Sequence, residues 1–392
     1  MRNADAGPVL ALNSGSSSLK FGLYRVNDSA MQMIFSGEAE AIGNDQSKFW
    51  VRDANGKILA PEEASVLSHA DAMARVGELF TRYKFSDPVA IGHRVVHGGA
   101  QLNRHCLIDA QVLQQLEAAT AFAPLHTPPA LRVIHQAQER FPRVAQVACF
   151  DTAFHAQLPD VARVLPVPKE LRSAGVRRYG FHGLSCESVV RQLGGDVPDR
   201  TVIAHLGSGA SITAVKAGQS IDTSMGMTPT GGVIMATRCG DLDPGVLIYL
   251  LREKRFDAAQ LQDLVDHRSG LLGISGVSGD MRRLRAAASA DARLAIEMFC
   301  YSVRKQIAAM SAALDGIDLL VFTGGIGEHD VEVRSAICGG LSVLGIELDA
   351  VRNRSAENPI GAATSRCQVR VMPAREDEQI AGHAWRLAME NA

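Results

Sequence analysis

Two arginines in this sequence stand beside glycines, in segments whose residue types could bind a small anion. Arg94 lies in Gly92-His-Arg-Val-Val-His-Gly-Gly99, and Arg238 lies in Ala236-Thr-Arg-Cys-Gly-Asp241. A guanidinium suits this task because its planar fork of N–H donors pairs with carboxylate or phosphate oxygens and stays charged. An isolated arginine is more often a surface ion-pair residue, but two of them beside glycine loops favour an anion site.

Three turns rich in glycine or serine could hold phosphate groups, and each follows an apolar segment. The turn from Asn13 to Lys20 offers backbone N–H groups, serine hydroxyls and a lysine, although its spacing is not that of a Walker A loop. The other two are Gly207-Ser-Gly-Ala-Ser211 and Gly324-Gly-Ile-Gly-Glu328. Any one of them alone is more often only a turn, because glycine is common where strands turn sharply. Together they predict the cradle of a nucleotide in a cleft.

Several histidines lie in short segments rich in Gly, Pro or Arg, which is typical of loops and strand ends. They are His93, His97, His126, His155, His182 and His205. The spacing of His93 and His97 resembles that of a metal pair, but the intervening valines and following glycines argue against the helix that such a pair needs. We therefore interpret these two as neutral core histidines. A zinc hydrolase built on the histidine cluster is a remote alternative.

The elements that must position these residues alternate between strands and helices. Strand, turn and strand are predicted from Val9 to Leu23, and the pattern returns from Val202 to Val215, which indicates a duplicated domain. Further strands are predicted at Val144–Phe150 and Leu319–Thr323. Helices are predicted at Ala70–Tyr83, Ala110–Ala119, Pro129–Phe141, Pro244–Glu253, Ala258–Asp266, Met281–Leu314 and about Asp377–Met389. This alternation predicts an α/β fold with mainly parallel sheets.

The chain length predicts two domains with a cleft between them, because 392 residues exceed the size of a usual single core. We place the first domain at residues 1–150 with the last helix, about 377–392, and the second at 151–376. This boundary sets Asp151 at the carboxyl end of a strand, where open α/β sheets place ligand-binding groups.

Composition excludes several classes of protein. The net charge is −2 with both signs scattered along the chain, so the sequence offers no basic face for nucleic acid or anionic lipid. No apolar run reaches the ~18 residues that cross a bilayer, and the opening MRNADAG lacks the order of a signal peptide, so we expect a cytoplasmic protein. The seven cysteines are widely spaced without a C-x-x-C pair, which argues against disulfides and zinc knuckles.

The sequence resembles the acetate kinase family (acetate/propionate kinases) from about Val9 to Ile380. The motifs that carry the resemblance, in order, are LNSGSSSLKF, GHRVVHGG, FAPLHTPPAL, FDTAFH, RRYGFHGLS, HLGSGAS, TRCGDLDPG, SGVSGDMR and FTGGIGEHD. The resemblance implies two duplicated α/β domains of the actin-like and sugar-kinase ATPase fold, closing over ATP or ADP in a nucleotide cleft. It also implies Mg²⁺ or Mn²⁺ and a homodimer, with dimerisation and nucleotide binding in the second domain.

The resemblance also implies roles for individual residues. Arg94 and Arg238 would bind the carboxylate and then the transferring phosphoryl group, His182 would stabilise that group, and Asp151 would position substrate or metal. Asn13 and Glu376 would help to hold the metal ion. The residues implied around the nucleotide are Ser16, Ser18, Lys20, His205, Leu206, Gly207, Ser208, Gly209, Asp280, Met281, Arg282, Gly325, Ile326, Gly327, Glu328 and His329. Those implied around the substrate are Val96, Leu125, His126, Phe181 and Pro229.

Three segments depart from the family pattern. Ser208 stands where the family commonly has Asn, and Thr230-Gly-Gly-Val-Ile-Met-Ala236 replaces a more usual Leu-Glu-Gly run. Pro373-Ala-Arg-Glu-Asp377 replaces the frequent Pro-Thr-Asn-Glu-Glu. The departures spare both arginines, the histidines and Asp151.

The function implied is reversible, in-line phosphoryl transfer from ATP to acetate, giving acetyl phosphate. A carboxylate is already a nucleophile at neutral pH, so the obstacle is negative charge in the transition state, which arginines, a histidine donor and Mg²⁺ offset. A propionate or butyrate kinase of the same family is the alternative among enzymes. An actin-like, non-catalytic ATP-binding switch is an alternative of another class.

Overall fold

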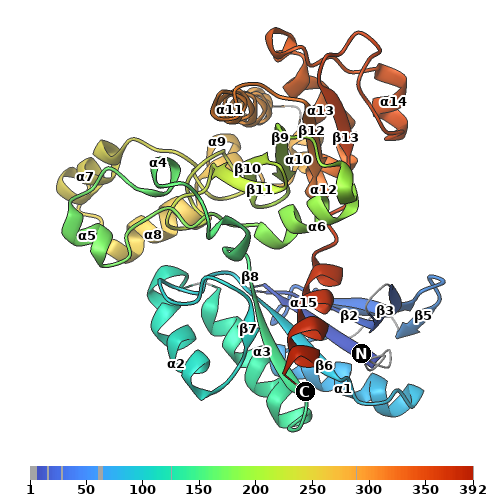
Figure 1. Ribbon diagram of the computed structural model, residues 1–392. Helices are drawn as coiled ribbons and strands as arrows, with labels where there is room; N and C mark the ends of the chain where they lie inside the picture. The colour runs from blue at the N-terminus through green and yellow to red at the C-terminus, as the bar shows by residue number, and fades with distance from the viewer. Residues whose placement is uncertain are drawn as a thin grey trace. The chain divides into compact units, whose positions relative to one another are not determined.

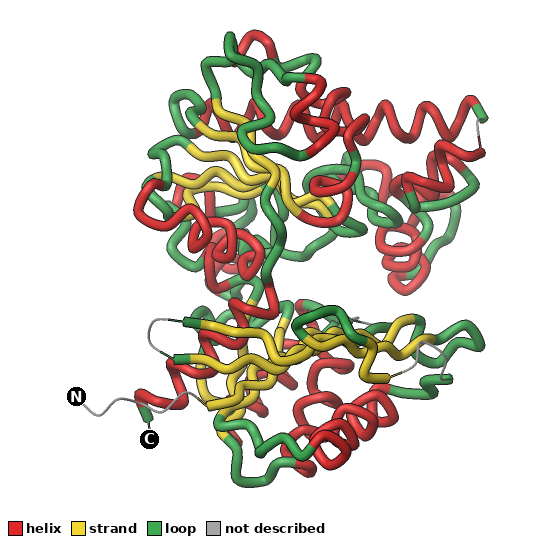
Figure 2. Tube along the Cα trace, turned by 90° about the vertical axis from the view of Figure 1, so that its right-hand side faces the viewer, coloured by secondary structure: helices red, strands yellow, loops and turns green. Residues whose placement is uncertain are grey.

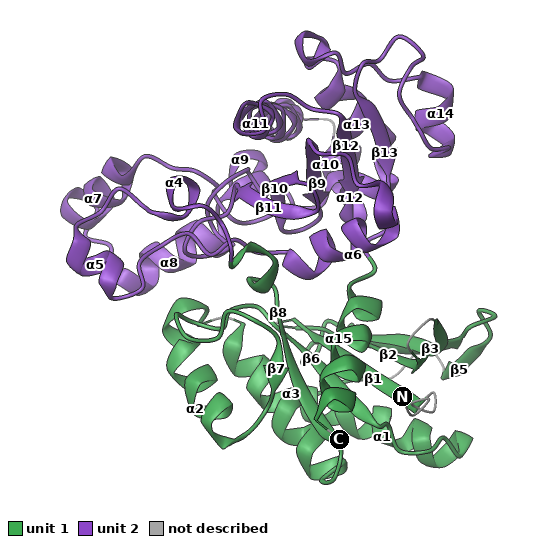
Figure 3. Cartoon of the chain, in the orientation of Figure 1, with its two compact units in different colours: residues 1–156, 375–392 green, residues 157–374 purple. Residues whose placement is uncertain are grey.

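The computed structural model describes residues 7–15, 17–27, 30–60, 65–124, 126–287 and 289–391. The chain divides into two compact units, coloured separately in Figure 3: unit 1 is Met1–Ala156 with Arg375–Ala392, and unit 2 is Gln157–Ala374. The chain therefore passes between the units after Ala156 and again after Ala374. The predicted boundaries, after residues 150 and 376, differ from these positions. The difference places Asp151 and Glu376 in unit 1.

Unit 1 contains a mixed eight-stranded sheet. Its order is β5 (Ile58–Ala60), β4 (Lys48–Asp53), β3 (Met31–Glu40), β2 (Leu19–Val26), β1 (Gly7–Ser14), β6 (Ala90–Val95), β8 (Ala145–Phe150) and β7 (Cys106–Leu107). Strands β1 to β5 form an antiparallel meander, whereas β6 runs parallel to both β1 and β8. In the parallel register Leu12 lies opposite His93, and Phe150 lies opposite Val95. Asn13, Arg94 and Asp151 therefore come to the same edge of the sheet.

Helices cover both faces of this sheet (Figure 1). On one face, Leu10 and Ile91 pack in a core with Met73 and Val76 of α1 (His69–Tyr83) and with residues of α3 (Thr127–Arg140). The helix α15 (Glu376–Glu390) packs on the other face of the sheet, against β1, β6 and β8. Neighbouring strand residues point to opposite sides, so Gly92, next to Ile91, faces α15. A Cβ on Gly92 would lie 2.5 Å from Ile380 Cγ2, so glycine is required for α15 to approach this closely. The remaining helices are α2 (Ala110–Ala118) and two 3₁₀ turns, Ala119–Phe122 and Ala153–His155.

Unit 2 repeats the central strand arrangement of unit 1. Its five strands follow the order β11 (Gln219–Thr223), β10 (Ala210–Lys216), β9 (Thr201–Leu206), β12 (Leu319–Thr323) and β13 (Gln368–Val371). The first three are antiparallel and the last two are parallel to β9, as for β3, β2, β1, β6 and β8. The predicted duplication is thus confirmed. The prediction of mainly parallel sheets is wrong, because the tight turns that join the hairpin strands force antiparallel pairing.

Helices also pack against the sheet of unit 2, which Figure 2 shows as a layer of strands. Those that pack most extensively on its strands are α4 (Asp160–Arg163), α6 (Gly183–Leu193), α11 (Ala290–Ala313) and α12 (Gly324–His329). The unit also contains α5 (Lys169–Ser173), α7 (Pro244–Glu253), α8 (Ala258–His267), α9 (Gly270–Ser275), α10 (Met281–Ala287), α13 (Val331–Cys338) and α14 (Ala350–Ser355), with 3₁₀ turns at Gly194–Asp196 and Ser342–Leu344. The helix predicted from Met281 to Leu314 is two helices, because Ser289 caps a new one by accepting the N–H of Ala292 at 3.1 Å. The turn predicted at Gly324 is the short helix α12.

Two predictions about the chain as a whole can be compared with the structure. All seven cysteines are free thiols, as their spacing predicts. Within the described residues, every helix is too short or too polar to span a bilayer.

Candidate active site

In unit 1, Arg94 is held by a buried carboxylate at the sheet edge. Its Nη2 donates to Asp151 Oδ2 at 2.6 Å and its Nε donates to Asp151 Oδ1 at 3.1 Å. Its Nη1 donates to Asn13 Oδ1 at 3.1 Å. These bonds use one N–H on each nitrogen, whereas a guanidinium has five N–H donors in all. Arg94 can therefore be fixed in place and still offer N–H groups to an anion.

Arg94 stays protonated although its guanidinium is largely buried. Burial acts to lower the pKa of the guanidinium, but the carboxylates of Asp151 and Glu376 outweigh it and raise the pKa. Asp151 is 1% exposed, so the pair is screened little by solvent. The result is a permanent positive charge at the carboxyl end of β6.

Two more carboxylates stand at the start of α15, next to this ion pair. Asn13 Nδ2 donates to Glu376 Oε2 at 3.1 Å and to Asp377 Oδ1 at 3.2 Å. Burial and then the neighbouring charge of Glu376 raise the pKa of Asp377 to about 6. Carboxylate and amide oxygens are hard donors of the kind that Mg²⁺ prefers, and a cation would relieve the repulsion between the two acids. The two carboxylates therefore fit the metal implied for Glu376, and they add Asp377, which sequence reasoning missed. Asn13 faces them with its amide nitrogen, and its Oδ1 accepts from Arg94, so Asn13 would need to turn its amide over to offer oxygen to the ion.

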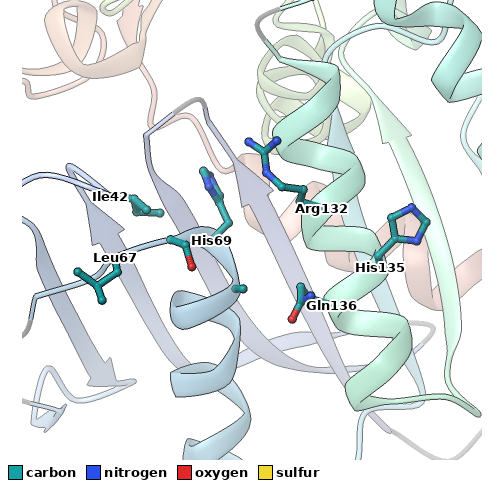
Figure 4. Close-up of a pocket in the computed structure, with 8 residues that line it drawn as sticks. Ile42, Leu67, His69, Arg132, His135 and Gln136 are labelled. Carbon is teal, nitrogen blue, oxygen red and sulfur yellow. The ribbon is translucent and has the colours of Figure 1, made fainter.

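The first predicted phosphate turn, which follows Asn13, is held by hydrogen bonds within the turn and from His69 and Ile42. Its own N–H at Gly15 donates to Ser18 O at 2.8 Å, and the buried His69 donates from Nε2 to Gly15 O at 3.0 Å. Ile42 N–H donates to Ser17 O at 2.9 Å. Figure 4 shows Ile42 and His69 in the wall of a pocket of about 380 Å³, with Arg132, His135 and Gln136 of α3 across from them.

For three other predicted residues of unit 1, the structure gives their burial and the element to which they belong. Lys20 is exposed and lies opposite Asn13 in the hairpin register. Val96 is buried just after β6, and His126 is half-buried at the start of α3. Ser16 and Leu125 lie outside the described residues.

In unit 2, two predicted histidines stack on one another. The rings of His182 and His205 lie with centroids 4.3 Å apart and planes 25° from parallel. His182 Nδ1 lies 3.0 Å from Ser211 Oγ, and His205 Nδ1 lies 2.8 Å from Ser185 Oγ. Each serine fixes the orientation of one ring, and sequence reasoning assigned neither a role. The signal available was their position inside the motifs HLGSGAS and RRYGFHGLS.

His182 and Arg238 face the same glycine. A Cβ built on Gly209 would lie 3.0 Å from His182 Nε2 and 3.4 Å from Arg238 Nη1, so both nitrogens border the turn after β9. His182 holds a left-handed backbone with φ 59°, a conformation that costs on the order of 1 kcal/mol and that gathers at functional sites. Arg238 Nη1 also donates to Pro229 O at 3.2 Å. An imidazole and a guanidinium at one glycine turn form a donor pair for an anionic group.

A pocket of about 810 Å³ lies beside this turn, within the usual size range for a small-molecule site. Of the residues predicted around the nucleotide, those that line it are Gly207, Ser208, Asp280, Met281, Arg282, Gly325, Ile326 and His329. His205, Leu206, Gly209, Gly327 and Glu328 are not among its lining residues. The pocket also includes Arg285, whose guanidinium pairs with Asp330 and with Glu332. A hydrogen bond from Arg282 lowers the pKa of Asp280 to about 2, so this carboxylate stays ionised.

The histidines interpreted as core residues are core residues. His93 Nε2 lies 2.6 Å from Gln146 Oε1, and burial lowers the pKa of His93 to about 4. His97 is buried and its Nδ1 accepts the N–H of Gly99 at 2.8 Å. Both rings are therefore neutral and occupied by structural hydrogen bonds.

The predicted substrate residues are divided between the units. Val96 and Arg94 belong to unit 1, whereas Phe181, Pro229 and Arg238 belong to unit 2, where the first two are buried. That both arginines meet one substrate stays a prediction.

Comparisons with known proteins find similar proteins over nearly the whole length of the chain. Residues 8–382 match the acetokinase family. "Acetate kinase" of Rhodopseudomonas palustris (strain TIE-1) is 43% identical over 394 residues, which is 97% of this chain and 98% of the relative. "Acetate kinase" of Methylocella silvestris is 42% identical over 390 residues, 96% of each chain.

Solved structures resemble the chain over the same length. A propionate kinase from Francisella tularensis superposes with a TM-score of 0.89 at 36% identity, covering 97% of this chain and 99% of its own. The acetate kinase of Porphyromonas gingivalis gives a TM-score of 0.85 at 35% identity, covering 97% of this chain and 100% of its own.

Proposed function

The chain belongs to the acetokinase family, and from this premise we propose that it catalyses the reversible transfer of the γ-phosphoryl group of ATP to acetate in the cytoplasm. An acetate oxygen forms a bond to the γ-phosphorus while the bond from that phosphorus to the bridging oxygen of ADP breaks. The products are acetyl phosphate and ADP, and no phosphoenzyme forms. The observation that carries the proposal is that two nitrogens, His182 Nε2 and Arg238 Nη1, border the glycine turn of unit 2. His182 Nε2 donates there when Nδ1 accepts the hydroxyl of Ser211 or when the ring is protonated.

The charged side chains supply what this reaction needs. The attacking carboxylate requires no general base, but the transition state spreads negative charge over the equatorial phosphoryl oxygens. In our proposal Arg94, fixed by Asp151, holds the carboxylate, while His182 and Arg238 donate to the phosphoryl oxygens as their charge grows. Asn13 and Glu376 would hold Mg²⁺, which when bound neutralises charge on the polyphosphate. The pocket beside Gly207 and Gly325 would take the nucleotide.

One assay tests this function and its nearest alternative. Acyl phosphate formed from Mg-ATP is trapped with hydroxylamine, using acetate, propionate and butyrate in turn. We expect kcat/KM to be highest for acetate and ADP release to depend on the added acid. A maximum at propionate would favour the alternative suggested by the propionate kinase of F. tularensis. ADP release that ignores every acid would refute a carboxylate kinase and favour an ATP-binding switch.

Val96 should set the size of the acid that is accepted. Val96 is 8% exposed and directly follows β6, two residues after Arg94. The family resemblance implies that this side chain contacts the methyl group of the substrate. Val96→Ala should therefore shift the ratio of kcat/KM toward propionate by roughly 5- to 150-fold, because one methylene is worth ~1 to 3 kcal/mol. The hydroxylamine assay measures the ratio. Val76→Ala, a buried valine of the same unit on α1, is the control. An unchanged ratio in Val96→Ala would remove Val96 from the substrate pocket.

We also propose that two copies associate through the surface of α7. This helix has no buried residue, although its sequence is PGVLIYLLRE and Ile248, Tyr249 and Leu251 are 47%, 51% and 41% exposed. An apolar helix exposed on this scale marks a protein interface. Sedimentation should give twice the chain mass of 41.9 kDa, and Tyr249→Glu should yield monomers. A wild-type protein that sediments as a monomer would contradict the proposal.

A further inference from the structure

Glu328 belongs to the glycine-rich segment that the resemblance assigns to the nucleotide, but its carboxylate binds the chain's own backbone. Glu328 Oε1 accepts the N–H of Gly324 at 3.0 Å and the N–H of Ala374 at 3.0 Å. Its neighbours Gly325, Ile326 and His329 line the nucleotide pocket, whereas Glu328 does not. A carboxylate turned toward the phosphates would repel them. The orientation of Glu328 is therefore that of a link within the protein.

The far end of this link is the segment through which the chain leaves unit 2. Ala374 is the last residue of unit 2. The preceding residue is also fastened, because Gln192 Nε2 donates to Pro373 O at 2.9 Å. Gln192 lies on α6, the helix that begins directly after His182. The crossover segment, residues 373–374, is thus tied both to the nucleotide segment and to the helix that follows the predicted catalytic histidine.

The near end of the link is held rigidly by a buried guanidinium. Arg334 is 1% exposed, and its Nη1 donates to Gly327 O and to Glu328 O, each at 2.9 Å. Its Nε donates to Asn353 Oδ1 at 2.7 Å. Since Arg334 orders the backbone of Glu328 in this way, the Glu328 carboxylate keeps a defined position between the N–H groups of Gly324 and Ala374.

We propose that Glu328 is a positioning residue that couples occupancy of the nucleotide pocket to the crossover segment, and so to the metal carboxylates that follow it. Glu376 and Asp377 come two and three residues after Ala374. A nucleotide that contacts Gly325 and Ile326 acts on α12, and Glu328 carries the effect to Ala374. This inference rests on the proposed function, in which Glu376 holds Mg²⁺.

Full-length Glu328→Ala and Glu328→Gln test the coupling. Hydrogen–deuterium exchange is followed in the peptide that contains Ala374, with and without ADP in EDTA, and the half-saturating Mg²⁺ concentration is measured in the kinase assay. In the wild type ADP should slow exchange at Ala374. In Glu328→Ala exchange should be about 10-fold faster, ADP should give no protection, and half-saturation by Mg²⁺ should rise about 10-fold. Glu328→Gln should stay within about 3-fold of wild type, because the amide oxygen can accept the same two bonds.

Two results would overturn the inference. If Glu328→Ala weakens ADP binding while ADP still protects Ala374, then Glu328 is a nucleotide contact. If neither exchange nor the Mg²⁺ requirement changes, then the link carries no coupling. Ala374→Pro removes the N–H donor and fixes φ at this position, but it leaves the bond from Glu328 to Gly324, so it should reproduce the rise in Mg²⁺ requirement even if Glu328→Ala does not fold. A wild type without kinase activity would refute the proposed function, whereas the exchange result would still stand by itself.

Discussion

Arg238→Ala should lower kcat by a factor on the order of 100 or more, with a smaller change in the KM for acetate. The guanidinium and His182 Nε2 border the same residue, Gly209, so the alanine variant loses one of two donors at that turn. In our mechanism this donor acts mainly in the transition state, when charge gathers on the phosphoryl oxygens. An interaction of this kind lowers kcat and kcat/KM together when it is removed. Single-turnover acetyl phosphate formation from Mg-ATP measures the effect on the chemical step.

Arg200→Ala is a matched control for this variant. Arg200 also belongs to unit 2 and pairs with Asp318, but both precede their strands, β9 and β12, and so lie at the sheet edge away from the glycine turns. The pair is 42% and 36% exposed, so its loss should change stability little and kcat not at all. Arg238→Lys should recover only part of the activity, because an ammonium lacks the planar fork. Wild-type turnover in Arg238→Ala would remove Arg238 from the mechanism.

The sequence predicted the strands that contain a run of apolar residues and missed strands that are short or rich in small and polar residues. The hairpins of β1–β2 and β9–β10 are rich in Leu, Val and Ile, and β1 and β9 are buried almost throughout. Strand β3, Met31–Glu40, buries Phe35, Gly37 and Ala39 on alternate positions. Two of these three are small, and the segment also contains charged residues, so its pattern did not predict a strand. This segment forms a strand because it pairs with β2 on one side and β4 on the other, and these contacts cannot be seen in the local sequence.

The candidate site illustrates the same limit. Asn13 and Glu376 are 363 positions apart, and only folding brings them within hydrogen-bond distance. Their pairing was expected from the family resemblance, since no spacing rule connects them. Asp377 was missed because an acid next to an acid is ordinary in sequence, and Ser211 was predicted only as the end of a phosphate turn, not as a partner of His182. Their roles become visible only from distances, which show Asp377 at Asn13 and Ser211 at His182.

Asp151→Asn should produce the largest loss of stability among the variants considered, about 3 kcal/mol for unfolding of unit 1. Asp151 is 1% exposed and accepts hydrogen bonds from both Nε and Nη2 of Arg94. The asparagine keeps the shape but not the charge, so a largely buried guanidinium loses its principal counter-ion. Breaking one partner of such a pair typically costs about 3 to 5 kcal/mol. We expect the lower end because the charges of Glu376 and Asp377 also favour ionised Arg94.

Tryptophan fluorescence during urea unfolding measures this loss in the right part of the molecule. The chain has two tryptophans, Trp50 and Trp385, and both belong to unit 1, so their signal is not mixed with the unfolding of unit 2. Asp71→Asn is the control, because the Asp71–Arg75 pair of the same unit is 30% and 25% exposed and should contribute about 1 kcal/mol or less. Equal urea midpoints for Asp151→Asn and the wild type would mean that Arg94 does not depend on Asp151. The buried ion pair would then not be what holds the guanidinium ready for the substrate.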